Sequence, residues 1–182
     1  MRGHVNFRFK GVSSKENVYT FPMSEMDIPT YGRGIEEEDN LPLFYRDMVH
    51  KLHNCGVTLP PDAKYLEVGS GNGKFLEHLR QQGLNVVGVD RWPRGPGIKQ
   101  ADTMALPQQD GSVDCVITKH IFDGWHYNQN LHDQEIMLSE IVRVLKKSGV
   151  YYAIENFFEP IKGLQLLRDP RRSQISSLYQ KI

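Results

Sequence analysis

The sequence predicts an α/β domain built on a mostly parallel sheet. Three short apolar runs, at residues 65–68, 85–89 and 113–118, have the length and composition of buried strands. A helix-patterned segment separates the first two runs and closes at Gly83. Because strands that alternate with helices form parallel crossover units, we expect these runs to lie in one sheet.

The first apolar run leads into a glycine-rich turn. Gly69, Gly71 and Gly73 alternate with single residues and are followed by helical spacing. Glycine accepts positive φ angles and lets a ligand approach the backbone, and the start of a helix offers unpaired N–H groups. The dinucleotide fingerprint G-x-G-x-x-G would need its third glycine at position 74, which is Lys74. The turn therefore predicts a nucleotide-type site and disfavours an NAD-dependent reductase.

An acid ends the second apolar run. Asp90 closes the segment 85–90, where the acid of a βαβ nucleotide site lies beside the ribose. An ionised carboxylate accepts hydrogen bonds from two hydroxyl groups at once. Asp90 is therefore expected to bind a ribose.

Four segments together resemble the class I S-adenosylmethionine-dependent methyltransferases of the small-molecule type. Residues 67–73 resemble the first motif, E/D-x-G-x-G-x-G, and residues 98–107 resemble the third. Residues 110–118 resemble the turn and strand "F-D-x-V", and 140–149 resemble "E-x-x-R-V-L-K-P-G-G". The resemblance implies a Rossmann-like three-layer αβα sandwich whose mostly parallel sheet has the strand order 3-2-1-4-5-7-6.

The resemblance also implies the cofactor, S-adenosyl-L-methionine, and its product, S-adenosyl-L-homocysteine. It places an acid, here Asp102, at the adenine amino group and Met104 against the ring. An alternative for Glu67 is an anchor of the loop backbone, which is compatible with the family role. The residues that the resemblance assigns to cofactor binding are Glu67, Gly69, Ser70, Gly71, Gly73, Asp90, Arg91, Asp102, Thr103, Met104 and Lys119.

Catalysis is expected at the segment that leaves the strand at 113–118, because open α/β sheets bind ligands at the carboxyl ends of their strands. His120 and His126 have reference pKa values near ~6.5, so either can take a proton from a hydroxyl acceptor, and Asp123 can orient it. A cofactor contact by His120 and plain packing by the aromatic neighbours are the alternatives. The neighbours that can wall the site are Phe122, Trp125 and Tyr127.

The chain is expected to form one structural domain with an N-terminal addition. Residues 1–38 are predicted to contain a strand and a lid segment, and residues 39–182 the methyltransferase domain. The run Val5–Lys10 alternates apolar and polar residues, as a half-buried strand does, although a basic arm is conceivable. Residues 23–34 have the proline and glycine content of a lid, and a helix that begins near residue 40 is expected to cover the cofactor pocket.

The C-terminal end is expected to depart from the family. Residues 155–182 number 28, whereas a helix, two strands and their connections need roughly 30 or more. We therefore predict a sheet abbreviated at its C-terminal edge, with residues 175–182 as at most one edge strand. An exposed edge invites pairing with the strand at 5–10 or with a second copy, which predicts a homodimer.

Composition restricts the partners. The 182 residues carry a formal charge of zero, which argues against a partner held mainly by phosphates, although Arg168, Arg171 and Arg172 form one candidate nucleic-acid patch. No apolar stretch approaches the roughly 20 residues of a membrane helix, and no signal-peptide core is evident. Cys55 and Cys115 are expected to be free thiols in a reducing cytoplasm, with no metal site.

The sequence thus predicts a cytoplasmic methyltransferase that acts on a small-molecule acceptor through oxygen, nitrogen or carbon. Two alternatives stay open. The first is a protein that binds S-adenosylmethionine without catalysis and serves as a regulatory or partner-binding module, because a shortened C-terminus would remove part of the acceptor wall. The second is methylation of an RNA or protein acceptor.

Overall fold

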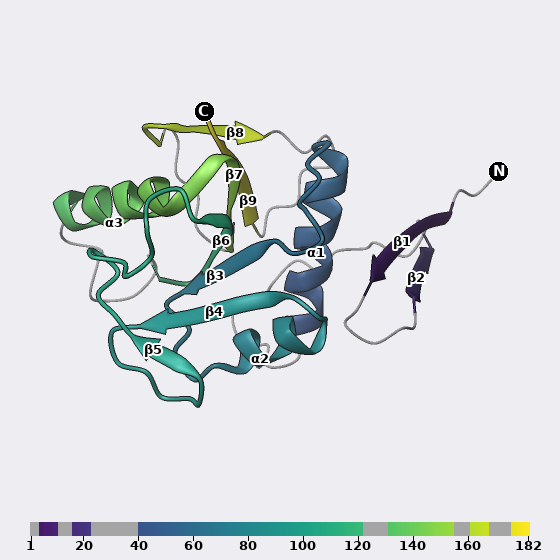
Figure 1. Cartoon of the computed structure of the whole chain (residues 1–182), viewed down its shortest axis with the longest axis horizontal. Coiled ribbons are helices and arrows are strands. Elements are labelled where there is room, and N and C mark those ends of the chain that lie inside the picture. The colour runs from purple at the N-terminus through teal and green to yellow at the C-terminus, as the bar shows by residue number, and fades with distance from the viewer. Residues whose placement is uncertain (1–3, 11–15, 23–39, 122–130, 155–160, 168–175) are drawn as a thin grey trace. The chain divides into compact units, whose positions relative to one another are not determined.

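A computed structural model shows how the predicted elements are arranged (Figure 1). The chain divides into two compact units, Met1–Glu36 and Glu37–Ile182. The residues that the structure describes are 4–10, 16–22, 40–121, 131–154, 161–167 and 176–182.

The first unit contains a two-stranded antiparallel sheet. Strand β1, His4–Lys10, pairs with β2, Glu16–Pro22, so that Phe7 lies opposite Tyr19. The strand predicted at 5–10 is confirmed, whereas its partner β2 was not predicted. The proposed lid at 23–34 lies outside the described residues.

The second unit is built on a seven-stranded sheet with the order β5-β4-β3-β6-β7-β9-β8. Strands β3 to β7 run parallel to one another, and β9 is antiparallel to both β7 and β8. The predicted α/β class with a mostly parallel sheet is confirmed. The strands are β3 Lys64–Val68, β4 Asn85–Asp90, β5 Ile98–Gln100, β6 Val113–Lys119, β7 Leu145–Ile154, β8 Leu164–Leu167 and β9 Ser176–Lys181.

Three described helices accompany this sheet: α1 Leu41–Asn54, α2 Lys74–Gln81 and α3 Leu131–Val144. The chain moves from β3 to β4 in one direction across the sheet and from β6 to β7 in the other. Right-handed crossovers therefore place α2 and α3 on opposite faces, which makes three layers (Figure 1). None of the described helices is long and apolar enough to cross a membrane.

The core lies between the central strands and the helices. Val68, Val89 and Val116 on three adjacent strands are fully buried, and Ile141 of α3 packs into the same cluster. Burial on both faces explains why these strands are continuous apolar runs in the sequence. Cys55 and Cys115 are free thiols, as expected.

The predicted abbreviation of the C-terminal edge is wrong. β8 and β9 form an antiparallel hairpin, and β9 lies inside the sheet between β7 and β8. The prediction assumed an average helix with its connections between the last two parts of the sheet. Only nine residues, 155–163, join β7 to β8, so the remaining residues suffice for both strands. The homodimer prediction depended on a missing hairpin, so it loses its premise, and β1 pairs with β2.

Candidate functional site

The glycine turn joins β3 to α2. Gly69, Gly71 and Gly73 have φ angles of 79°, 53° and 79°, which residues with a Cβ rarely adopt. The turn is tied to the neighbouring strand, because the N–H groups of Gly69 and Ser70 both donate to the Val89 carbonyl, at 2.9 and 3.1 Å. A Cβ on Gly69 would overlap the side chain at position 121. The predicted glycine spacing is therefore required by the backbone path itself.

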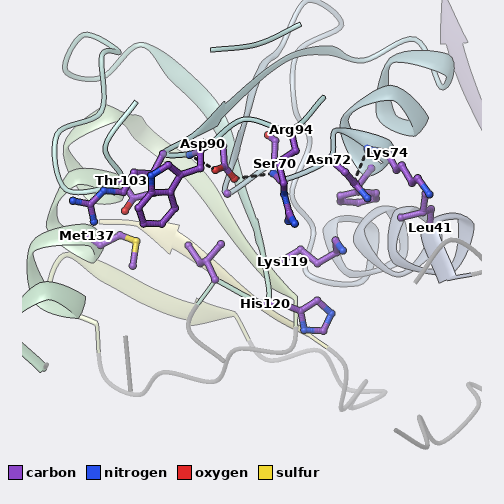
Figure 2. Close-up of a pocket in the computed structure, with 16 residues that line it drawn as sticks. Leu41, Ser70, Asn72, Lys74, Asp90, Arg94, Thr103, Lys119, His120 and Met137 are labelled. Atoms are coloured by element: carbon purple, nitrogen blue, oxygen red, sulfur yellow. Dashed lines mark hydrogen bonds between the residues drawn. The ribbon is translucent and has the colours of Figure 1, made fainter. Parts of the chain in front are cut away.

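Asp90 connects this turn to the loop after β4. Its Oδ2 accepts a hydrogen bond from the Gly71 N–H at 2.7 Å, and its Oδ1 accepts one from the Trp92 N–H at 2.7 Å (Figure 2). A carboxylate has about four acceptor positions, so it can still accept further hydrogen bonds. The sequence predicted Asp90 as a ligand-binding acid, and the structure adds that it organises the backbone of the site.

A pocket of about 520 Å³ opens at the carboxyl ends of the parallel strands (Figure 2). This volume is typical of small-molecule sites. The structure brings together in its lining the following residues that the sequence predicted: Gly69, Ser70, Gly71, Asp90, Arg91, Thr103, Lys119 and His120.

Other residues line the same pocket without having been assigned to the site. Leu41 and Met137 come from α1 and α3, far from the motifs in sequence, so no local signal marks them. Trp92 did carry a signal, because a tryptophan is costly to expose, and this one, two residues after the strand-end acid Asp90, is 60% exposed. The full set of additional lining residues is Leu41, Asn72, Lys74, Phe75, Trp92, Arg94, Ile121 and Met137.

Four predicted cofactor residues do not line the pocket in the described part of the chain. Gly73 is the N-cap of α2, and Glu67 lies beneath the turn with 1% of its surface exposed. Asp102 accepts the Met104 N–H at 2.9 Å and lies 3.8 Å from the Arg91 guanidinium. The predicted catalytic residues Asp123 and His126 lie outside the described residues.

Glu67 is an ionisable group in the core. Its Oε2 has no hydrogen-bond partner among the described residues. Burial raises the pKa of this carboxyl to about 7, although the charge of Lys119 acts in the opposite direction. A buried polar oxygen usually has a hydrogen-bond partner, and the residues that the structure describes do not supply one here.

Glu67 makes stability depend on pH. Its folded pKa of about 7 lies above the ordinary value of 4.5, so the folded state binds the proton more tightly than the unfolded chain. The folded state is therefore favoured at low pH, and this advantage is lost as pH rises through the window between the two values. Relative to Glu67→Gln, the wild type is expected to lose about 2 kcal/mol of unfolding free energy between about pH 5 and about pH 8. Denaturant titrations of both proteins at each pH measure this difference, and a constant difference would contradict the buried-acid assignment.

His120 lies at the end of β6 with a φ angle of 55° and lines the pocket. Non-glycine residues in this region cost backbone energy and occur often at functional sites. The sequence predicted His120 as a candidate base, and its place in the pocket agrees with a functional role.

Comparison with known proteins points to one family. A family model described as a methyltransferase domain matches residues 66–153. An uncharacterized methyltransferase of Mycobacterium tuberculosis strain H37Rv is 33% identical over 102 residues, which are 50% of this chain and 39% of the relative. One of Synechocystis sp. is 26% identical over 112 residues, which are 58% of this chain and 53% of the relative.

Comparison with solved structures shows a likeness of fold. The structure resembles the crystal structure of a TehB-like SAM-dependent methyltransferase from Corynebacterium glutamicum, with a TM-score of 0.51 and 17% identity. The match covers 80% of this chain and 98% of that chain. The chain spans only part of the two curated relatives: the matched region covers 39% of the first and 53% of the second, which is less than two thirds of either.

Proposed function

We propose that the chain is a class I S-adenosylmethionine-dependent methyltransferase and that it transfers the methyl group of S-adenosylmethionine to a small-molecule acceptor. The observation that carries the proposal is the junction of the glycine turn with Asp90 at the mouth of the pocket. This junction offers backbone N–H groups, a carboxylate and a close approach to the chain at one point.

The residues present fit the cofactor. The ribose needs an acceptor for two hydroxyl groups, and Asp90 keeps acceptor capacity after its two backbone bonds. Thr103 Oγ1 is buried, lines the pocket and has no partner among the described residues, so a polar ligand group would satisfy it. The Glu67 Oε2 atom beneath the turn is unsatisfied in the same way.

The proposed cofactor residues divide by the part of the ligand they would hold. Asp90 and Arg91 would hold the ribose side, and Asp102, Thr103 and Met104 the adenine. The glycine turn with Ser70, together with Lys119, would hold the amino-acid end, with Glu67 as the buried acid beneath it.

The reaction needs placement more than functional groups. S-adenosylmethionine supplies an electrophilic methyl group on its sulfonium sulfur. The protein must hold the acceptor in line at about 3 to 3.5 Å and exclude water. Leu41, Phe75, Ile121 and Met137 supply apolar walls for this purpose.

The proposal is tested by calorimetric titration of the purified protein with S-adenosylmethionine and, separately, S-adenosylhomocysteine. We expect both to bind with micromolar dissociation constants, and methyl transfer from labelled S-adenosylmethionine to follow in an acceptor screen. If neither ligand binds, the proposed function is wrong. The non-catalytic alternative rested on a shortened C-terminus, and β8 and β9 are both present, so that argument no longer favours it.

His120 and His126 are the proposed bases, with Asp123 as the orienting acid. The Asn variant of the true base is expected to keep its affinity for S-adenosylhomocysteine and to lose about 100-fold or more in turnover, because a positioned base contributes roughly that factor. Turnover and calorimetry on His120→Asn and His126→Asn measure the two effects separately. Full turnover in both variants would exclude a histidine base.

A further inference from the structure

The lining of the pocket is strongly basic. Among the described lining residues are four formal cations, Lys74, Arg91, Arg94 and Lys119, and one acid, Asp90. Both oxygens of that acid already accept backbone N–H bonds. The start of α2 adds the positive end of a helix dipole. S-adenosylmethionine itself carries a net positive charge, so its binding alone would increase the positive charge in the pocket.

One of these cations, Arg94, lies in a loop whose backbone contacts the glycine turn. The loop of residues 91–97 follows Asp90, and its Arg94 N–H donates to the Gly71 carbonyl at 2.9 Å. Gly95 lies so close to the Asn72 carbonyl that a Cβ there would overlap it. Arg80 Nη2 donates to the Gly97 carbonyl at 3.3 Å at the far end of the loop. The backbone of the loop is therefore fixed to the glycine turn and to α2.

This backbone presents the Arg94 guanidinium to the pocket. A Cβ built on Gly71 would lie 3.4 Å from Arg94 Nη2, so the guanidinium lies directly over the turn. Arg94 and Lys119 both line the pocket (Figure 2). In the described part of the chain no carboxylate lies within ion-pair distance of Arg94, whereas Arg91 has Asp102 at 3.8 Å.

We propose that the methyl acceptor carries an anionic group, a carboxylate or a phosphate, and that Arg94 binds this group. The inference rests on the proposed function, because it concerns the second substrate of the same site. The planar guanidinium matches carboxylate and phosphate oxygens in pairs. The cofactor has a single carboxylate, and Lys119 is the residue proposed to hold the amino-acid end that carries it. Arg91 is proposed for the ribose side and lies next to Asp102, so Arg94 is left for the acceptor. Trp92 lines the same pocket as Arg94 and provides an aromatic surface for a planar acceptor.

The test uses the full chain saturated with S-adenosylhomocysteine and three probes in calorimetry: benzoate, benzamide and inorganic phosphate. We expect one or both anions to bind and benzamide, the uncharged isostere of benzoate, not to bind. Arg94→Gln is expected to weaken anion binding at least tenfold and to change the affinity for S-adenosylhomocysteine less than threefold. Tighter binding of benzoate would indicate a carboxylate acceptor, and tighter binding of inorganic phosphate would indicate a phosphate acceptor. Arg46→Gln, at an exposed position of α1 outside the pocket lining, is the matched control and should bind like the wild type.

Three results would overturn the proposal. The first is that neither anion binds the wild-type complex, and the second is that Arg94→Gln binds the anions as tightly as the wild type. The third is that Arg94→Gln loses affinity for S-adenosylhomocysteine by the same factor as for the anions, which would assign Arg94 to the cofactor. Failure of S-adenosylhomocysteine to bind the wild type would instead overturn the proposed function. The same anion titrations on the protein alone would then test the Arg94 site by itself.

Discussion

Replacing Asp90 with alanine is expected to lower the affinity for S-adenosylhomocysteine about 100-fold, which corresponds to about 2.7 kcal/mol. The carboxylate accepts the N–H groups of Gly71 and Trp92, each at 2.7 Å, and is the proposed ribose acceptor. The substitution therefore removes a ligand contact and leaves two backbone donors of the site without a partner. Calorimetric titration of the variant and the wild type measures the loss.

Two further variants serve as controls for the Asp90→Ala measurement. Asp90→Asn keeps one acceptor oxygen and the shape of the side chain, so it should lie between the wild type and Asp90→Ala. Asp62→Ala removes an exposed acid next to β3 and should leave the affinity unchanged. Unchanged affinity in Asp90→Ala would mean that the ribose does not lie at the end of β4.

Replacing Arg143 with methionine is expected to lower the free energy of unfolding by about 3 kcal/mol. Arg143 lies on α3 and donates two hydrogen bonds to the Glu140 carboxylate, both at 2.7 Å. It also donates to the carbonyls of Leu106 and Gln108, at 2.8 and 2.9 Å. Its contact with Asp110 at 2.6 Å adds little, because that side chain is 80% exposed. Denaturant unfolding of both proteins measures the difference.

The size of this effect follows from the groups that lose a partner. Hydrogen bonds from Arg143 lower the pKa of Glu140, and without them a largely buried carboxylate keeps only the Leu106 N–H. The methionine retains most of the apolar stem, so the loss reports the polar contacts. Arg46→Met, at an exposed position of α1, should change stability by less than about 0.5 kcal/mol. A loss below about 1 kcal/mol in Arg143→Met would show that the network contributes little to folding.

Arg143 also shows how a family motif is explained by structure. The sequence placed residues 140–149 in a segment that resembles other methyltransferases but gave no reason for the acid and the arginine three residues apart. The structure supplies the reason, since the pair holds the segment 106–110 against α3. That segment begins three residues after Thr103, which lines the pocket, so the network helps to position one wall of the site.

The elements that the sequence predicted well are those with a strong local pattern. The strands around Val68, Val89 and Val116 are buried on both faces, which demands apolar runs, and the glycine turn demands residues without a Cβ. Asp114 in β6 has a structural role, since it accepts hydrogen bonds from the Lys64 N–H and Lys146 Nζ, at 2.9 Å each.

The elements that the sequence predicted poorly depend on distant parts of the chain. A count of 28 residues suggested an incomplete sheet, yet a short connection allows β9 to lie between β7 and β8. β9 pairs with the edge of β7 that β6 leaves open. The periodicity of residues 176–181 does not show which strand β9 pairs with.

The sequence by itself determined the α/β class, the order of the central elements and the place of the glycine turn and Asp90, because each depends on the backbone state of consecutive residues. Only the tertiary structure decided that Leu41 and Met137 wall the pocket, that Asp90 joins two backbone segments, and that Arg94 lies over the glycine turn. These features are contacts between residues that are far apart in the chain, or between residues joined by a turn whose conformation the sequence does not predict. They form only when the sheet and its helices pack together.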